Sequence, residues 1–226
     1  MSCKKLKGGK KLKRRKKGVF VTDCDGTMAN SIPELFNGSI ECIGNFFPVE
    51  GIEEKAEELV AHFGGESFAS GLKRALESLF PGKENEEKRE KCYKAIAAKR
   101  IEIYDKVKPF PGTIEAVKKL AKRYHLVVSS GLEHIILDSW LEKNGLGKDL
   151  FKIVYGLEDG KKDIHVQLVR KKFPGAKVFY AGDSIAEMKL GDFAIGVARR
   201  PWHQELLLRG GAWAVISSFK EILNIL

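Results

Sequence analysis

The feature that most constrains the fold is a short apolar run that ends in two carboxylates. Residues 19–21 (Val-Phe-Val) are apolar and β-prone, which predicts a short buried strand. Asp23 and Asp25 follow, one residue apart. In open α/β sheets ligands bind at the carboxyl ends of strands, and neighbouring carboxylates repel each other unless a cation or a shared proton relieves them. The pair is therefore a candidate Mg²⁺ site, because Mg²⁺ prefers oxygen ligands; an ordinary Asp-Gly turn is the alternative interpretation.

Strand and helix patterns alternate in two parts of the chain, residues 18–30 and 108–226. This alternation predicts an α/β core with a Rossmann-like parallel sheet. Residues 31–107 show helical patterns and no good strand, which predicts a small all-helical cap domain inserted into the core. The strands predicted after the insertion are residues 125–131, 151–155, 177–183, 193–197 and 212–216. Four helices are predicted inside it, at residues 32–47, 52–63, 66–80 and 84–107.

The run V-F-V-T-D-C-D-G-T at residues 19–27 resembles the first motif of the haloacid dehalogenase superfamily, the Asp-based phosphohydrolases. The resemblance implies that Asp23 is the nucleophile and that Asp25 is the general acid/base. A carboxylate can form an aspartyl-phosphate, and a second, protonatable carboxylate can protonate the leaving oxygen and then activate water. True dehalogenases resemble this pattern only at the first Asp, so the second one favours phosphate chemistry.

Two further stretches resemble the second and third motifs of the same superfamily. Ser129 ends a predicted strand, and its hydroxyl could bond a phosphoryl oxygen, as could the backbone N–H groups of Ser130 and Gly131. Lys161 opens a predicted helix and matches the third motif, where a cation neutralises both the nucleophile and the incoming phosphate. Its neighbour Lys162 is the rival, and the register is left open.

A fourth stretch, residues 179–187, resembles the last motif, in which a strand leads to Gly-Asp and a second acid follows four residues later. The resemblance implies a magnesium site formed by Asp23, the backbone carbonyl of Asp25, and Asp183. Glu187 belongs to the same set, either near the metal or near Lys161. The expected cofactor is Mg²⁺.

The resemblance implies hydrolysis of a small phosphomonoester, with the cap selecting the substrate. Residues 67–74 have some likeness to the cap helix of phosphoserine phosphatases, which makes Lys73 and Arg74 candidate substrate contacts. The expected carboxylate-binding Arg falls nearer Ala75, so phosphoserine and phosphoglycolate-type substrates both stay open. A regulatory module that is phosphorylated without turnover is another interpretation, although Asp25 argues against it. The sequence leaves the oligomeric state open.

The net charge of +10 lies in one segment, because residues 1–17 contain ten Lys or Arg and no acid. Such a block predicts a disordered arm that could touch nucleic acid or an acidic surface, and nucleic-acid binding is the less favoured interpretation. No apolar run approaches the ~18 residues of a membrane span, so we expect no membrane association. The basic start lacks the apolar segment of a signal peptide, and we expect a cytoplasmic protein.

Overall fold

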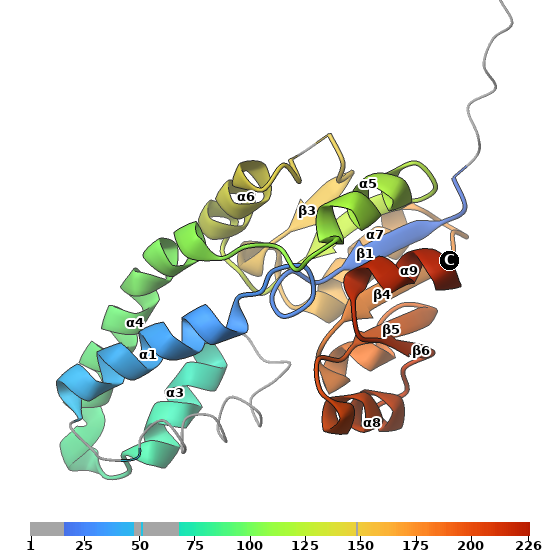
Figure 1. Ribbon diagram of the computed structural model, residues 1–226. Coiled ribbons are helices and arrows are strands. Elements are labelled where there is room, and N and C mark those ends of the chain that lie inside the picture. The colour runs from blue at the N-terminus through green and yellow to red at the C-terminus, as the bar shows by residue number, and fades with distance from the viewer. Residues whose placement is uncertain (1–15, 48–50, 52–67, 148) are drawn as a thin grey trace, which may run out of the picture.

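A parallel six-stranded sheet forms the centre of the molecule in the computed structural model, which describes residues 16–47, 51, 68–147 and 149–226 (Figure 1). The strand order is β3-β2-β1-β4-β5-β6, and every neighbouring pair is parallel. The predicted α/β fold with a parallel sheet is confirmed. The strands are β1 (Val19–Thr22), β2 (His125–Ser129), β3 (Ile153–Tyr155), β4 (Val178–Gly182), β5 (Phe193–Val197) and β6 (Ala214–Ile216).

The strand order reverses direction at β1, which lies between β2 and β4. Thr22 at the end of β1 pairs with Val128 of β2 and with Ala181 of β4. The following residues of the three strands therefore meet at one edge of the sheet. Ligands of open α/β sheets bind at such a switch point, outside the carboxyl ends of the strands.

Helices cover both faces of the sheet (Figure 1). Side chains alternate along each strand, so Phe20 and Leu126 pack under α5, α6 and α9, while Val21 and Val127 pack on α7. The core helices are α5 (Thr113–Ala121), α6 (His134–Lys143), α7 (Lys162–Lys172), α8 (Pro201–Arg209) and α9 (Ile222–Ile225), with 3₁₀ turns η2 (Leu157–Asp159), η3 (Ile185–Lys189) and η4 (Phe219–Glu221).

The described part of the insertion is helical and extends to one side of the sheet (Figure 1). It contains α1 (Ile32–Phe46), α3 (Phe68–Leu79), the 3₁₀ turn η1 (Lys83–Asn85) and α4 (Glu86–Lys106). These helices share a small apolar core in which the rings of Phe47 and Phe80 stack with centroids 3.9 Å apart. The helix predicted at residues 52–63 lies outside the described residues. We refer to residues 31–107 as the cap.

Helix α4 of the cap packs against α6 of the core. Arg100 Nη1 donates to Glu133 Oε1 at 3.0 Å, and the indole N–H of Trp140 donates to the carbonyl of Val107 at 3.0 Å. The side chain of Arg100 is only 4% exposed. Its partner Glu133 is 35% exposed, so the pair is half-buried, and with the Trp140 hydrogen bond it links the cap to the core.

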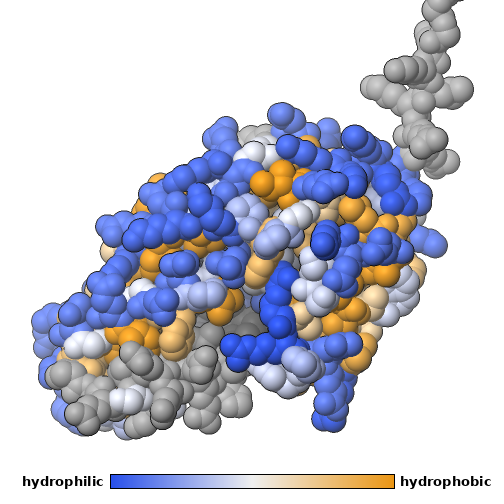
Figure 2. All heavy atoms as spheres, in the orientation of Figure 1, coloured by the Kyte–Doolittle hydropathy of each residue, from blue (hydrophilic) through white to orange (hydrophobic). Residues whose placement is uncertain are grey.

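Hydrophilic side chains cover most of the face seen in Figure 2, with hydrophobic residues in scattered spots between them. Among the described residues, none of the helices combines the length and the apolar character needed to cross a membrane. Residues 1–15 lie outside the described part, so the interpretation of the basic segment stays a prediction.

Candidate active site

The site is built around Asp23, which directly follows β1 and is 2% exposed. Lys162, the first residue of α7, donates from Nζ to Oδ1 of Asp23 at 2.7 Å. The same ammonium donates to Oε1 of Glu187 at 2.6 Å. Burial disfavours the charged lysine, but the carboxylates of Asp23 and Glu187 outweigh it and hold the pKa of Lys162 well above its ordinary value. Lys162 is therefore a fixed cation beside the predicted nucleophile.

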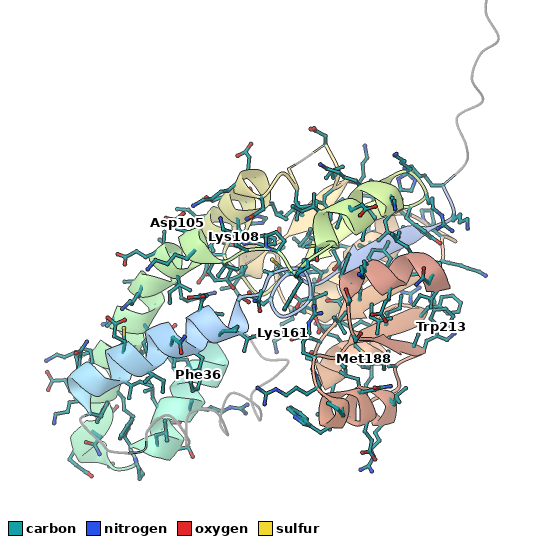
Figure 3. All side chains as sticks on the ribbon, viewed as in Figure 1. Phe36, Asp105, Lys108, Lys161, Met188 and Trp213 are labelled. Atoms are coloured by element: carbon teal, nitrogen blue, oxygen red, sulfur yellow. The ribbon has the colours of Figure 1, made fainter. Side chains whose placement is uncertain are left out.

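The expectation that Lys161 contacts Asp23 is wrong, and the rival Lys162 takes that place. Lys161 is the residue before the helix, with an extended backbone (φ −78°, ψ 159°), and its side chain is exposed (Figure 3). Gly160 turns the chain with φ 112°, and the helix starts at the second lysine. The side chain of that first helical residue is the one that reaches the strand ends.

Glu187, in the 3₁₀ turn after β4, holds this lysine in place. Its Oε1 accepts from Lys162 and from the hydroxyl of Tyr180 at 3.2 Å. Its Oε2 accepts from the amide of Ser184 at 3.0 Å and from the hydroxyl of Ser184 at 2.9 Å. A carboxylate has about four lone-pair positions, so these four bonds use its accepting capacity. Glu187 therefore acts on Lys162 more directly than it could act on a metal ion.

Asp183 follows β4 and completes an acidic cluster with Asp23 and Glu187, in which one oxygen from each residue lies within 4.8 Å of the others. Burial raises the pKa of Asp183 to about 7, and the charge of Glu187 adds to the effect. Burial also raises the pKa of Asp23 well above its ordinary value, although Lys162 opposes the shift. Gly26 (φ 65°) is needed beside the cluster, because a Cβ there would fall 1.9 Å from Oδ2 of Asp183.

The donor set of this cluster fits a divalent cation such as Mg²⁺. Three carboxylates face one lysine, so a single positive charge stands against three acidic groups. Hard divalent cations bind such oxygen ligands. Since the oxygens of Glu187 are engaged, Asp23 and Asp183 are the side chains best placed to hold the ion.

Asp25 is held by two hydroxyl groups of the cap. Its Oδ1 accepts from Ser31 Oγ at 2.6 Å and from the phenol of Tyr104. Ser31 immediately precedes α1, and Tyr104 lies in the last turns of α4. Burial, and then the charge of Asp25, raise the pKa of Tyr104 well above its ordinary value, so the phenol keeps its proton and stays a donor. Sequence reasoning missed both residues.

Ser129 lies at the end of β2, and the strand register places it beside Asp23. Its hydroxyl is fully buried and lies 2.9 Å from Nδ1 of His165. Ser130 differs from the expectation, because its amide already donates to the carbonyl of Tyr155 at 3.0 Å and belongs to the sheet. That amide is not available to a phosphate. Gly131, next in the chain, is partly exposed.

The structure does not bring the two predicted cap contacts into the carboxylate cluster. Lys73 and Arg74 are exposed on α3, and Nζ of Lys73 lies 4.6 Å from the ring centroid of Tyr93 on α4. Their predicted contact with substrate stays a prediction.

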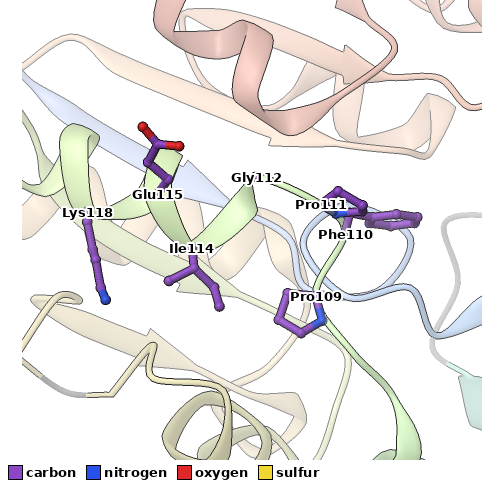
Figure 4. A pocket seen from close by; sticks show the side chains of 7 residues that line it. All are labelled: Pro109, Phe110, Pro111, Gly112, Ile114, Glu115 and Lys118. Carbon is purple, nitrogen blue, oxygen red and sulfur yellow. The ribbon is translucent and has the colours of Figure 1, made fainter.

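A separate hollow of about 560 Å³ lies over the loop before α5 and over α5 itself (Figure 4). It contains none of the residues that surround Asp23, so it is not the candidate site. The residues that line it are Pro109, Phe110, Pro111, Gly112, Ile114, Glu115 and Lys118.

Comparison with solved structures finds proteins of the same fold. A solved structure described as a predicted phosphoglycolate phosphatase from Haemophilus somnus 129pt is 18% identical and has a TM-score of 0.76, with 94% of this chain and 99% of that chain covered. A haloacid dehalogenase-like family hydrolase from Streptococcus pneumoniae is also 18% identical, with a TM-score of 0.71 and coverage of 92% and 97%. A predicted phosphatase from Clostridium acetobutylicum is 20% identical, with a TM-score of 0.69 and coverage of 93% and 98%.

At these identities the TM-scores show a shared fold. Comparison with curated proteins finds no match. The family model of the haloacid dehalogenase-like hydrolases matches residues 20–196, which is more than half of the sequence. The chain therefore belongs to the haloacid dehalogenase-like hydrolase family.

Proposed function

We propose that the chain is a Mg²⁺-dependent phosphatase that hydrolyses a small phosphomonoester through an aspartyl-phosphate at Asp23. One observation carries the proposal: Lys162 bridges Asp23 and Glu187 at 2.7 and 2.6 Å, with Asp183 in the same acidic cluster. A buried carboxylate beside a fixed cation, at the switch point of a parallel sheet, suits attack on an anionic group.

In the first step an oxygen of Asp23 attacks phosphorus, and the bond from phosphorus to the leaving oxygen breaks. Asp25 gives its proton to that oxygen. Because Oδ1 of Asp25 already accepts from Ser31 and Tyr104, a proton on this carboxyl belongs on Oδ2, which the two hydroxyls leave for the substrate. The phosphoryl group is then bound to Asp23 as an acyl phosphate, and the alcohol leaves neutral.

In the second step Asp25, now ionised, takes a proton from a water molecule that attacks phosphorus. The bond between phosphorus and the Asp23 oxygen breaks, so inorganic phosphate is released and the carboxylate of Asp23 is restored. Lys162 neutralises the charge on Asp23 and on the phosphoryl oxygens throughout. A divalent cation held by Asp23 and Asp183 would supply further positive charge for the phosphoryl oxygens.

The proposed class of substrate follows from a structural neighbour and from the charge of the cap. A similar solved structure is described as a predicted phosphoglycolate phosphatase, and the cap carries the basic residues Lys73 and Arg74 on α3. Phosphoglycolate-type and phosphoserine-type metabolites, both small and anionic, are the first compounds to screen. We propose that the protein works in the cytoplasm, as an enzyme of such metabolites.

The test is hydrolysis of p-nitrophenyl phosphate with Mg²⁺ and with EDTA. Asp23→Asn should abolish phosphate release, and Lys162→Met should lower kcat by about 10²–10³, the cost of removing one preorganised charge-stabilising group. Lys161→Met is the matched control and should keep most of the activity. Equal losses in the two lysine variants, or full activity in Asp23→Asn, would contradict the proposed site. Phosphorylation of Asp23 without release of phosphate would favour the regulatory module.

A further inference from the structure

A buried histidine, His165, lies outside the machinery described so far but touches it. It is in α7, three residues after Lys162, and its side chain is fully buried. Residues three apart on a helix share a face, so the first turn of α7 directs Lys162 to Asp23 and His165 to Ser129. The ring also stacks on Tyr155, with centroids 5.1 Å apart.

Few groups compete for the hydroxyl of Ser129. His165 Nδ1 lies 2.9 Å from its Oγ, and the hydroxyl of Tyr180 lies 3.3 Å from it. Tyr180 also lies 3.2 Å from Oε1 of Glu187, and a hydroxyl has only one proton to donate. The carboxylate is the stronger acceptor, so Tyr180 donates to Glu187. The direction of the serine proton is then decided by His165.

A proton on Nδ1 is the tautomer in which the ring donates to Ser129. Nε2 of His165 is buried and has no hydrogen-bond partner among the described residues. Backbone groups of Gly156 and Gly160 raise the pKa of the ring, against the larger effect of burial. A buried N–H without a partner is rare and costly, so a bare lone pair at Nε2 is the better arrangement. Burial also lowers the pKa of His165, which keeps the ring neutral at neutral pH.

We propose that His165 is a positioning residue for the phosphoryl group: its Nδ1–H donates to Ser129 Oγ and so turns the serine's own proton toward a phosphoryl oxygen at Asp23. The inference rests on the proposed function, because it needs a phosphoryl group beside Ser129. It adds a residue that acts only through the serine and never touches the substrate.

The kinetic test is a double-mutant cycle on kcat/KM for p-nitrophenyl phosphate. His165→Phe keeps a ring to stack on Tyr155 and removes the donor, and it should lower kcat/KM about tenfold, the size of one neutral hydrogen bond. His165→Asn, whose amide can offer an N–H near the position of Nδ1, should recover most of the loss. In a Ser129→Ala background His165→Phe should cost nothing further. His125→Phe, at the opposite end of β2, is the matched control and should leave kcat/KM unchanged.

Thermal unfolding of each variant shows whether a loss of activity is a loss of folding. If the losses of His165→Phe and Ser129→Ala multiply, the two residues act independently and the inference is overturned. Histidine ¹⁵N NMR of the wild-type chain gives a readout without turnover: the Nδ1–H tautomer is expected at His165, and the Nε2–H tautomer would also overturn it.

The same spectra separate this inference from the proposed function. If the wild-type chain with Mg²⁺ hydrolyses no phosphomonoester, the proposed function fails. Orthovanadate is then the probe: it should shift the Nδ1 resonance of His165 in the wild type and not in Ser129→Ala. Absence of that shift in the wild type would overturn the positioning role.

Discussion

Replacing Asp183 by Asn should stabilise the metal-free protein at neutral pH while it destroys activity. The folded protein holds the pKa of this carboxyl at about 7, against an ordinary value of 3.8, mainly through burial and then through Glu187. The folded state therefore binds the proton more tightly than the unfolded chain. The stability contributed by Asp183 is fully present below about pH 4 and is lost as the pH rises through 7.

Before any reduction for solvent screening, a difference of about three pKa units corresponds to about 4 kcal/mol of folding free energy. The carboxyl is partly exposed, and solvent screening reduces this, so we expect Asp183→Asn to raise the free energy of unfolding by ~2 kcal/mol at pH 7.5 in EDTA. The gain should shrink toward pH 4, where the wild-type carboxyl is protonated in both states. Mg²⁺ should stabilise the wild type much more than the variant, because it binds the folded cluster.

The assay is urea unfolding followed by circular dichroism, between pH 4.5 and 7.5, with EDTA or with Mg²⁺. Asp192→Asn is a control of opposite sign. Burial alone would raise the pKa of Asp192, but the Val178 amide and the Arg170 guanidinium lower it, so its contribution to stability is present above the ordinary pKa and is lost as the pH falls. Asp192→Asn should therefore destabilise at pH 7.5. A destabilised Asp183→Asn in EDTA at pH 7.5 would refute the reasoning.

Three further substitutions probe the site and the attachment of the cap. Gly26→Ala should cost about 1–3 kcal/mol in urea unfolding and most of the activity, because φ is 65° and the new Cβ would collide with Asp183; a silent variant would contradict this. Tyr104→Phe should lower kcat about tenfold or more with little change in Tm, because Asp25 loses a donor; unchanged kcat would remove the phenol from the mechanism. Arg100→Met should lower the free energy of unfolding by about 1–2 kcal/mol, because the Glu133 carboxylate that it leaves is 35% exposed; a loss below about 0.5 kcal/mol would show that this pair does not tie the cap to the core.

Local patterns were enough to predict the parts of the site that follow strands. The β-prone run before Asp23 and Asp25 forms a strand in the structure, as its sequence predicts. The position of the two carboxylates at the carboxyl end of the strand follows from the strand itself. The same holds for Asp183 after β4. These positions depend only on a few neighbouring residues and on the alternation of side chains along a single strand.

The residues that sequence reasoning misplaced depend on where an element begins or on what lies beside it. The choice between Lys161 and Lys162 is decided by the residue at which α7 starts. The amide of Ser130 is taken by Tyr155 because β3 runs beside β2, and the order of strands is not written in any local pattern. Tyr104 reaches Asp25 across 79 positions and had no local signal at all.

The hydrogen bonds of Glu187 determine how much negative charge remains around Asp23. The two oxygens of Glu187 accept four hydrogen bonds, from Lys162, Tyr180 and Ser184. Glu187 therefore holds the lysine in place and adds its own negative charge to the surroundings of Asp23. Burial raises the pKa of Asp23 well above its ordinary value, and Lys162 opposes this shift without reversing it. A further cation beside the carboxylate would favour its ionised form. Binding of a divalent cation and ionisation of Asp23 are therefore expected to be linked, so conditions that favour the bound cation should also favour the ionised carboxylate.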